Sequence, residues 1–450
     1  MGVRLFGTDG VRGVANDTLT PECAFALGQA AARVLLEGTR SPQVLVGRDS
    51  RWSADLLESA LSAGLMAVGV TVVHAGILPT PAVAYLTRRL GMAAGVMISA
   101  SHNPIADNGI KFFGSDGFKL PDAVEDAIEA VMDRPLEKRP TGLHVGRVHP
   151  LPRGAVRDYL EHLAEAAGPR PVALNVVVDA AHGAATRVAA PLMRRVGATA
   201  RVIHATPDGR RINVGCGSTH PAALQRRVRA AGADLGLALD GDADRLIAVD
   251  ERGEIVDGDA LLLILARALR HEGRLAGDAV VATVMSNLGL KQALARDGIR
   301  LVESPVGDRY VLESMLRSGA VLGGEQSGHI LQLDRSTAGD GLLTGMRLLS
   351  VLASTGLPLS SLAADLRRLP QVLRNVRVER TAGYETLPGV AEAVASGREA
   401  LGESGRILVR ASGTEPLIRV MAEGEPRERV EAVVLAVAHG IARALHGEVM

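Results

Sequence analysis

The feature that most constrains how this chain can fold is a pattern that occurs three times along it: an apolar run, an amphipathic segment and a second apolar run. The three copies lie at 44–46, 56–68 and 70–74, at 175–179, 185–196 and 200–204, and at 279–284, 288–296 and 299–303. Short β-branched runs that alternate with amphipathic segments are typical of parallel βαβ units. The repeat therefore predicts three similar mixed α/β domains, each containing a βαβ-type unit.

The C-terminal part of the chain has a different pattern. Strand-like runs lie at 371–379, 406–409 and 417–421, and an amphipathic segment lies at 427–444. This pattern predicts a smaller C-terminal α+β domain. With 450 residues the chain is also too long for a single core. We therefore expect four domains, at 1–150, 151–252, 253–366 and 367–450.

Each copy of the repeat is followed by another short apolar run that leads into a polar loop. The loops are Ser99-Ala100-Ser101-His102-Asn103-Pro104, Asp240-Gly241-Asp242-Ala243-Asp244-Arg245 and Gly323-Gly324-Glu325-Gln326-Ser327-Gly328-His329. Ligands of open parallel sheets bind beyond the carboxyl ends of the strands, which is where all three loops fall. We therefore expect the domains to surround one central cleft that the three loops share.

Composition argues against several classes of protein. The formal net charge is zero and aromatic residues make up 2% of the chain, so neither charge nor stacking surfaces favour a nucleic-acid partner. The apolar stretch Ala260–Ala266 is too short to cross a bilayer, and the N-terminus shows no apolar segment followed by a cleavage site. With only Cys23 and Cys216, we expect neither a disulfide framework nor a thiolate zinc site. We expect a cytoplasmic protein with no nucleic-acid or membrane partner.

The acidic loop carries Asp240, Asp242 and Asp244 at alternate positions. Oxygen atoms at this spacing can converge on one cation, and an all-oxygen site favours Mg²⁺, Mn²⁺ or Ca²⁺ over zinc. The spacing partly matches an EF-hand, but Arg245 stands where that loop needs glycine, and the flanks are strand-like. Three carboxylates beside an apolar strand repel one another unless a cation neutralises them. The loop is therefore predicted to hold a divalent metal.

The loop around Ser101 allows two interpretations. In one, Ser101 is the nucleophile of a hydrolase and His102 is its base. The G-x-S-x-G elbow of such enzymes is missing, however, and neighbours in sequence rarely form a nucleophile–base pair. In the other, Ser101 carries a phosphate that faces the metal, since a phosphoserine adds up to two negative charges and three acceptor oxygens. Together with the acidic loop, the phosphoserine is favoured.

Lysine is rare in this chain and is found only at Lys111, Lys119, Lys138 and Lys291, among 50 basic residues. Arginine stays charged in proteins, so a lysine inside a motif suggests a role that arginine cannot fill. Lys111 follows the Ser101 loop, and burial beside a cation can depress a lysine pKa enough to make it a base. The alternative is that Lys111 is a charge partner of the phosphoserine. We favour the base and keep the alternative open.

Two further loops offer groups for a phosphorylated sugar. Glu325, Ser327 and His329 supply a carboxylate, a hydroxyl and an imidazole, which suit sugar hydroxyls or an amine. In the C-terminal domain, guanidinium groups, hydroxyls and a glycine backbone form a candidate phosphate cradle at Arg410, Ser412, Gly413, Thr414 and Arg419. The Gly-rich segment 7–13 lacks the lysine of a Walker loop, so we expect no nucleotide there, although Arg12 could contact a phosphate.

Taken together, the motifs resemble the α-D-phosphohexomutase superfamily. The segments that carry the resemblance follow the family's order across essentially the whole chain, at 6–13, 98–104, 108–111, 240–245, 306–310, 324–329 and 410–416. The resemblance implies four domains around a central cleft and a phosphoserine at Ser101. It also implies Mg²⁺ on Asp240, Asp242 and Asp244, with Ser101 as a further ligand. Sugar contacts would come from the third loop, phosphate contacts from the cradle, and Arg245 would steady the phosphoryl group or the acidic loop.

The resemblance also implies an activity. Within the superfamily, the opening Phe6-Gly7-Thr8-Asp9-Gly10 and Gln326 are similar to members that act on a hexosamine phosphate. Such an enzyme converts glucosamine 6-phosphate to glucosamine 1-phosphate through a bound 1,6-bisphosphate and supplies UDP-N-acetylglucosamine and cell-wall precursors. It would be a homodimer. The nearest alternative is a phosphoglucomutase or phosphomannomutase. A metal-dependent phosphatase would not need the Arg410 cradle, and a non-catalytic sugar-phosphate sensor would not keep Ser101 and Lys111.

Overall fold

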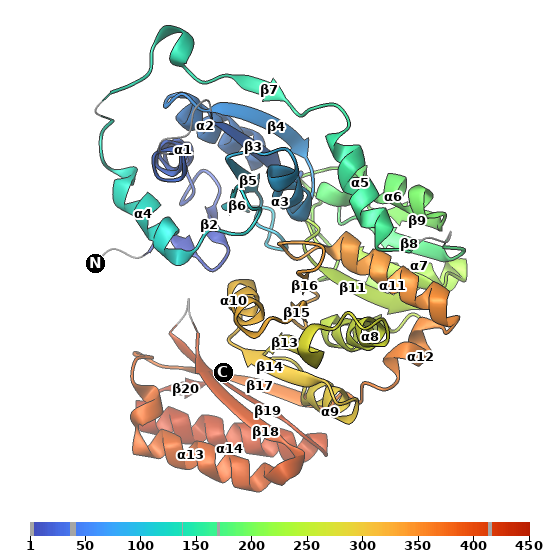
Figure 1. Cartoon of the computed structure of the whole chain (residues 1–450). Helices are drawn as coiled ribbons and strands as arrows, with labels where there is room; N and C mark the ends of the chain where they lie inside the picture. Colours follow the sequence, from blue (N-terminus) through green and yellow to red (C-terminus); the bar gives the residue numbers. More distant parts are fainter. Residues whose placement is uncertain (1–3, 37–41, 137, 169–171, 413–415) are drawn as a thin grey trace. The chain divides into compact units, whose positions relative to one another are not determined.

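The computed structural model describes residues 4–36, 42–136, 138–168, 172–412 and 416–450. This part of the chain divides into two compact units, one of residues up to 285 with 298–364 and one of residues 286–297 with 365–450. Three sheets belong to the first unit and one to the second (Figure 1). The predicted fold class, mixed α/β with a smaller C-terminal α+β part, is confirmed. The predicted boundaries after 150, 252 and 366 stay predictions.

Seven strands form the first sheet, in the order β1-β2-β6-β5-β3-β4-β7. At its centre, β3 (Gln43–Arg48) pairs in parallel with β4 (Thr71–Ile77) and with β5 (Ala94–Ile98). The chain then returns as β6 (Asp107–Gly114), which runs antiparallel beside β5. The outer strands are β1 (Phe6–Gly7), β2 (Gly10–Val14) and β7 (Val148–Pro150). The polar loop with Ser101 is thus the connection between β5 and the returning strand β6.

The second sheet repeats this core order. Its strand β8 (Asn175–Asp179) pairs in parallel with β9 (Thr199–Ile203) and with β10 (Leu235–Leu239). The returning strand β11 (Leu246–Asp250) runs antiparallel beside β10, and β12 (Ile255–Val256) lies at the edge. The acidic loop is therefore the connection between β10 and β11.

The third sheet repeats the order once more, which confirms the internal repeat. Strand β13 (Ala279–Thr283) pairs in parallel with β14 (Arg300–Ser304) and with β15 (Leu322–Gly324), and β16 (Ile330–Gln332) returns antiparallel beside β15. The third polar loop connects β15 to β16. All three polar loops thus occupy the same position in their sheets.

Alternation of side chains along β3 explains how helices cover both faces of the first sheet. Val44 and Val46 belong to the core that includes residues of α1 (Pro21–Leu35) and α2 (Ser53–Met66). Gly47 has the opposite orientation and lies against Val83 of α3 (Thr80–Arg89). The other helices of this unit are α4 (Asp122–Met132), α5 (Ala155–Glu165), α6 (Ala189–Val196), α7 (Ala222–Ala231), α8 (Gly258–His271), α10 (Asp308–Ser318), α11 (Gly341–Thr355) and α12 (Leu359–Ala363).

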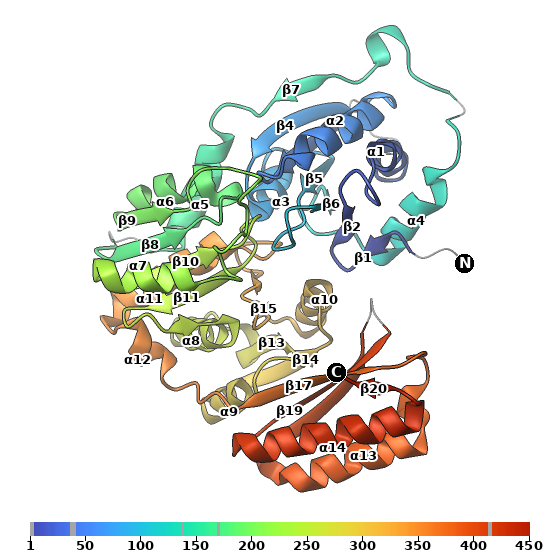
Figure 2. The same cartoon turned by 180° about the vertical axis from the view of Figure 1, so that it is seen from behind.

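Helix α11 joins the second and third sheets into one unit. Asp340 caps its N-terminus by accepting a hydrogen bond from Leu343 N. Gly345 lies against Leu237 and Leu246 of the second sheet, while α7 packs with Ala238 on the opposite face. Figure 1 shows α11 in front of this sheet, and Figure 2, from behind, shows α7 in front. Helix α11, which follows the third sheet in the chain, therefore packs against the second sheet.

The second unit is a four-stranded antiparallel sheet with the order β18-β19-β17-β20. Its strands are β17 (Gln371–Arg377), β18 (Arg406–Ala411), β19 (Leu417–Glu423) and β20 (Glu448–Val449), and its helices are α9 (Leu288–Arg296), α13 (Pro388–Leu401) and α14 (Arg427–Leu445). Apolar residues of α13 and α14 share one core with the sheet, and Figure 1 shows the two helices side by side. The sequence pattern did not predict α13 or β20.

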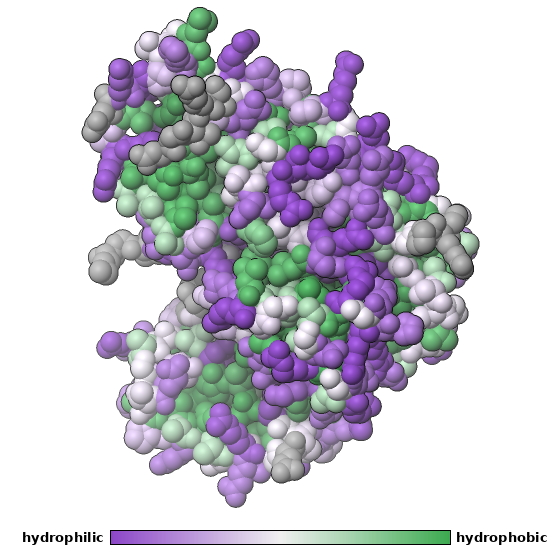
Figure 3. Space-filling view, viewed as in Figure 1, coloured by the Kyte–Doolittle hydropathy of each residue, from purple (hydrophilic) through white to green (hydrophobic). Residues whose placement is uncertain are grey.

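Hydrophilic side chains cover most of the face of the molecule seen in Figure 3, with smaller hydrophobic areas between them. None of the helices in the described ranges is long and apolar enough to cross a membrane.

The close contact between α1 and α2 gives a stability prediction. A Cβ atom added at Gly64 would lie 2.1 Å from the backbone oxygen of Phe25, so alanine must push the two helices apart. We expect Gly64→Ala to lower the free energy of unfolding by about 1–3 kcal/mol. Ser59→Ala, on the exposed face of the same helix, should change it by less than about 0.5 kcal/mol. Urea denaturation followed by circular dichroism checks both, and equal midpoints would contradict the prediction.

Candidate active site

Ser101 is held in an unusual conformation at the carboxyl end of β5. Its φ angle of 52° lies in the left-handed region, which non-glycine residues seldom adopt. Its backbone N donates to Ser99 Oγ at 2.9 Å, and its own Oγ donates to Asp240 Oδ2 at 2.5 Å. The side chain that the sequence predicted to carry a phosphate therefore lies directly against the acidic loop of the second sheet.

A fully buried arginine, Arg51, holds the Ser101 loop in place. Its Nη2 donates to Ser101 O at 3.0 Å and to Asn103 O at 2.8 Å, and its Nη1 donates to Asp107 O at 2.9 Å. Its Nε pairs with buried Asp49 at 3.0 Å. Five N–H groups in a fixed fork allow one arginine to bind several carbonyls at once. No role of Arg51 was predicted from the sequence, although a charged pair, Asp49 and Arg51, directly after an apolar strand was a signal for one.

The three carboxylates of the acidic loop are buried and close together. Asp240, Asp242 and Asp244 each offer an oxygen atom, and these atoms lie within 4.8 Å of one another. Burial and the charges of Asp244 and Asp242 raise the pKa of Asp240 well above its usual range. Within the described part of the chain, Asp242 Oδ1 and Asp244 Oδ1 have no hydrogen-bond partner although both are buried. Buried carboxylates that lie this close together, with oxygen atoms that accept no hydrogen bond, fit a divalent cation.

Lys111 lies beside this loop with its ammonium group surrounded by acids. Its Nζ is 2.9 Å from Asp242 Oδ2, 2.9 Å from Asp9 Oδ2 and 3.6 Å from Asp244 Oδ2. Burial alone would lower its pKa, but the three carboxylates reverse this and raise it. This direction is opposite to the depression expected beside a bound cation, because the carboxylates stabilise the charged form. The ion pairs of Lys111 are with acids, and both of its predicted roles, base and charge partner of the phosphoserine, stay predictions.

A second layer of charged side chains surrounds this centre, and only Arg12 among them was predicted from the sequence to have a role. Asp9 pairs with Arg12, Lys111 and Lys119, and Lys119 also pairs with Asp308. Arg12 also donates to an oxygen of the Ser101 loop, Asn103 Oδ1, at 3.3 Å. Lys119 and Lys111 share the carboxylate of Asp9. The scarcity of lysine in the chain was the signal that could have identified Lys119.

His102 is a poor general base in this setting. Its Nδ1 lies 3.2 Å from Ser101 Oγ. Burial, together with the charges of Arg245 and Arg12, lowers its pKa to about 4. An imidazole of such low basicity is a weak proton acceptor, so the hydrolase interpretation, in which His102 is the base, is disfavoured.

The third polar loop lies beside the acidic loop. Leu246 N donates to Gly328 O at 3.0 Å, and Arg245 forms a β-bridge with His329. His329 Nδ1 is 3.6 Å from Asp244 Oδ2. Burial lowers the His329 pKa, but Asp244 outweighs it and raises the pKa above its ordinary value. The structure thus brings His329 and Arg245 to the metal loop.

Glu325 and Ser327 form a small polar group in the same loop. Glu325 accepts from Gly307 N at 3.0 Å and from Ser327 Oγ at 3.2 Å. Arg245 completes the surroundings of the metal loop, with its Nε 3.9 Å from Asp244 Oδ1 and its backbone N donating to Asp240 Oδ1 at 3.2 Å. All three polar loops of the repeat therefore meet in the first unit.

The candidate phosphate cradle lies in the second unit. Arg410 and Arg419 stand directly opposite each other on β18 and β19, and Arg419 Nη2 donates to Ser412 Oγ at 3.5 Å. Burial and the charge of Arg419 lower the pKa of Arg410. Gly413 and Thr414 lie outside the described residues. Like charges opposite each other are unfavourable in a sheet, so this pair fits an anion that binds both.

Comparison with known proteins places the chain in a family. Four domain models match: phosphoglucomutase/phosphomannomutase alpha/beta/alpha domain I at 3–139, domain II at 157–253, domain III at 257–369 and the C-terminal domain at 373–440. A phosphoglucosamine mutase of Moorella thermoacetica is 55% identical over 433 residues, which are 96% of this chain and 97% of the relative. The chain belongs to the phosphoglucomutase/phosphomannomutase family of phosphohexose mutases, which are metal-dependent isomerases.

Solved structures have the same fold. A phosphoglucomutase/phosphomannomutase family protein of Burkholderia thailandensis matches with a TM-score of 0.81 and 25% identity, over 98% of this chain and 97% of that one. An N-acetylphosphoglucosamine mutase of Aspergillus fumigatus, in complex with GlcNAc-6P and magnesium, matches with a TM-score of 0.71 and 19% identity, over 99% of this chain and 96% of that one. The sequence-based resemblance is confirmed.

The contacts of Arg51 give a prediction for the Ser101 loop. In Arg51→Lys, one ammonium cannot reach all the carbonyls that the guanidinium binds, so the loop loses its fixed geometry. We expect turnover to fall about 100-fold and the free energy of unfolding to fall by about 1–3 kcal/mol.

Arg48→Lys is the matched control, three positions earlier on the same segment. Arg48 pairs with Asp55 and Glu58 in a partly exposed setting, so its replacement should cost less than about 1 kcal/mol and leave turnover unchanged. Steady-state kinetics and denaturation compare the two variants. Equal effects would show that Arg51 does not position the loop.

Proposed function

We propose that the chain interconverts glucosamine 6-phosphate and glucosamine 1-phosphate, with Ser101 as the phosphate carrier. The observation that carries the proposal is the contact between Ser101 Oγ and Asp240 Oδ2, at 2.5 Å, inside a cluster of three buried carboxylates. A phosphorylated serine beside a divalent cation is a group-transfer centre. The name of the relative that is 55% identical over 96% of the chain supports the amino sugar as substrate.

The reaction takes two phosphoryl transfers. In the first, the bond from phosphorus to Ser101 Oγ breaks and a bond to the 1-oxygen of glucosamine 6-phosphate forms, while the 1-hydroxyl gives up its proton. In the second, the phosphoryl group on the 6-oxygen of the 1,6-bisphosphate moves to Ser101 Oγ, and the 6-oxygen takes up a proton. The sugar leaves as the 1-phosphate with the carrier restored. Lys111 and Arg245 offset negative charge that spreads over the phosphoryl oxygens.

The proposed cation is Mg²⁺. Asp240, Asp242, Asp244 and an oxygen on Ser101 would hold it, since hard oxygen donors are the ligands that Mg²⁺ prefers. When bound, it neutralises charge on the transferred group. The buried Oδ1 atoms of Asp242 and Asp244, which accept no hydrogen bond within the described ranges, support this assignment.

The remaining residues are proposed to bind substrate. Glu325, Ser327 and His329 would contact the sugar hydroxyls or its amine. The phosphate that is not being transferred would bind the cradle formed by Arg410, Ser412, Gly413, Thr414 and Arg419, and Arg12 would contact a phosphate near Ser101. We further expect a cytoplasmic homodimer that supplies UDP-N-acetylglucosamine synthesis.

A comparison of substrates tests the proposal. Turnover on glucosamine 6-phosphate should exceed turnover on glucose 6-phosphate and mannose 6-phosphate by at least about tenfold in kcat/KM, since each tenfold step needs only about 1.4 kcal/mol of selective contact. Similar values for all three sugars would instead favour a phosphoglucomutase or phosphomannomutase. Ser101→Ala should abolish turnover on every sugar, and intact mass should show one phosphate on the wild-type chain that this variant lacks.

Metal removal gives a separate prediction. Chelation should abolish turnover, and Mg²⁺ should restore it. Asp242→Asn should weaken Mg²⁺ binding at least about tenfold, because it removes one charged ligand of the cluster. Asp250→Asn is the control: Asp250 Oδ1 accepts from the backbone N of Arg252 and of Glu254, and an asparagine oxygen can accept both. Titration calorimetry with Mg²⁺ measures the affinities, and equal values for the two variants would exclude Asp242 as a ligand.

A further inference from the structure

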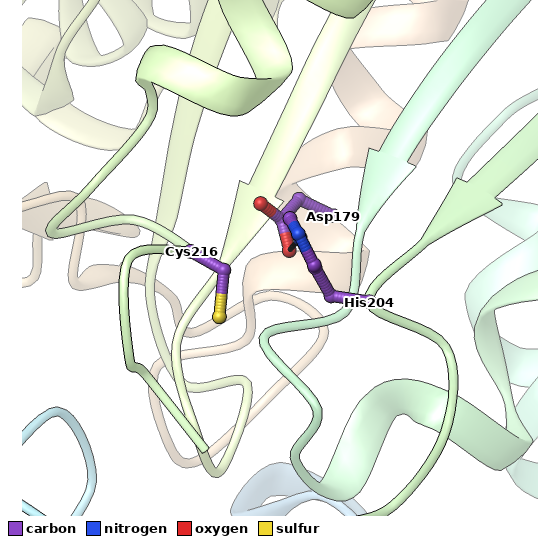
Figure 4. A group of neighbouring side chains, drawn as sticks. All are labelled: Asp179, His204 and Cys216. Atoms are coloured by element: carbon purple, nitrogen blue, oxygen red, sulfur yellow. Dashed lines mark hydrogen bonds and ion pairs between the residues drawn. The ribbon is translucent and has the colours of Figure 1, made fainter. Parts of the chain in front are cut away.

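Three side chains of different chemistry lie together in the second sheet, away from the contacts of Ser101. Asp179 ends β8, His204 directly follows β9, and Cys216 lies on the loop that precedes α7 (Figure 4). One donor atom of each lies within 4.8 Å of the other two. Asp179 and Cys216 are buried, while the side chain of His204 is 27% exposed. The proposed phosphoryl transfer uses none of the three.

Hydrogen bonds hold the Asp179 carboxylate in a fixed orientation. Its Oδ1 accepts from Ala181 N at 2.9 Å, and its Oδ2 accepts from Gly217 N at 2.9 Å. His204 Nδ1 lies 2.9 Å from Asp179 Oδ1. The acid is therefore anchored by two backbone segments, one of which carries Cys216. A carboxylate fixed in this way presents its remaining lone pairs at a defined position.

The chemistry of this group differs from that of the acidic loop. A thiolate, an imidazole and a carboxylate are the donors that Zn²⁺ prefers, whereas three carboxylates suit Mg²⁺. We propose that Asp179, His204 and Cys216 form a second metal site that binds Zn²⁺, with a water molecule as the fourth ligand. Because the His204 side chain is partly exposed, solvent can reach this group of residues. This proposal departs from the expectation, based on the cysteine count, that the chain has no thiolate zinc site, because the donor set here needs only one thiolate.

The distances require only local adjustment. Zinc–ligand bonds of about 2.0–2.3 Å in a tetrahedral site place donor atoms about 3.2–3.7 Å apart. The present 2.9 Å between His204 Nδ1 and Asp179 Oδ1 needs a small separation. Cys216 Sγ, which now donates to Arg211 O at 3.7 Å, must turn from that carbonyl and lose its proton to solvent as the ion binds.

The segment that carries Cys216 contacts both the Ser101 loop and the strand that leads into the acidic loop. Asn213, three residues before Cys216, donates from Nδ2 to Ser101 O at 2.8 Å. Ser218 N, two residues after Cys216, donates to Leu239 O at 2.9 Å, next to the first metal ligand Asp240. An ion bound to Cys216 would therefore restrict the motion of the segment 213–218, which supports both the Ser101 loop and the acidic loop.

Cobalt spectroscopy of the full chain tests the proposal. Co²⁺ replaces Zn²⁺ in such sites, and a cysteine ligand gives an intense thiolate-to-cobalt charge-transfer band that oxygen ligands do not give. The titration is run with excess Mg²⁺ to occupy the acidic loop. We expect one equivalent of Co²⁺ to produce the band and one equivalent of Zn²⁺ to remove it.

Variants assign the band to the site. The chain has two cysteines, so a band that persists in Cys23→Ser must come from Cys216, and this variant leaves the proposed site untouched. The band should be lost in Cys216→Ser and in His204→Asn. His182→Asn is the matched control, because the His182 ring lies beside that of His204 but its Nδ1 bonds to Thr206 O. Absence of the band from the wild type, its loss in Cys23→Ser, or its persistence in Cys216→Ser would overturn the proposal.

Discussion

The structure depends on the balance of charge around three buried carboxylates. Removing an ionised carboxylate from water costs several kcal/mol, roughly, unless an opposite charge or a cation compensates it. Here the compensating groups come from distant parts of the chain: Lys111 from the first sheet, Arg245 from the second and His329 from the third. The acidic loop can be buried only when segments of all three sheets are in place around it. Its charge therefore links formation of the site to folding of the first unit.

The architecture was largely predictable because periodicity depends on local sequence. The runs at 44–46, 175–179 and 279–284 each became the central parallel strand of a sheet. The position of the polar loops could be predicted because ligands of parallel sheets bind beyond the carboxyl ends of the strands. The expectation that Ser101 faces the acidic loop agrees with its contact to Asp240.

What could not be predicted depends on contacts between residues far apart in the chain. The sequence shows Asp9, Lys119 and Asp308 as three unrelated charges, and only folding places Lys119 between the two acids. The surroundings of Lys111 are a second example, since the acids that raise its pKa come from other parts of the chain. Arg51 shows a related limit: its partners are backbone carbonyls, which have no signature in the sequence.

The shared strand order has a consequence for how such a protein can arise and change. In each of the three sheets, the polar loop is anchored on both sides by adjacent paired strands, β5 and β6, β10 and β11, or β15 and β16. Duplication of one ancestral sheet would leave three copies of one loop in equivalent scaffolds. Each copy could then take one of the proposed roles: carrying the phosphate, binding the cation or contacting the sugar. Such a change in one loop would not disturb the strand pairing that supports the other two. With the roles proposed for them, the third loop can vary with the substrate while the first two keep the chemistry constant.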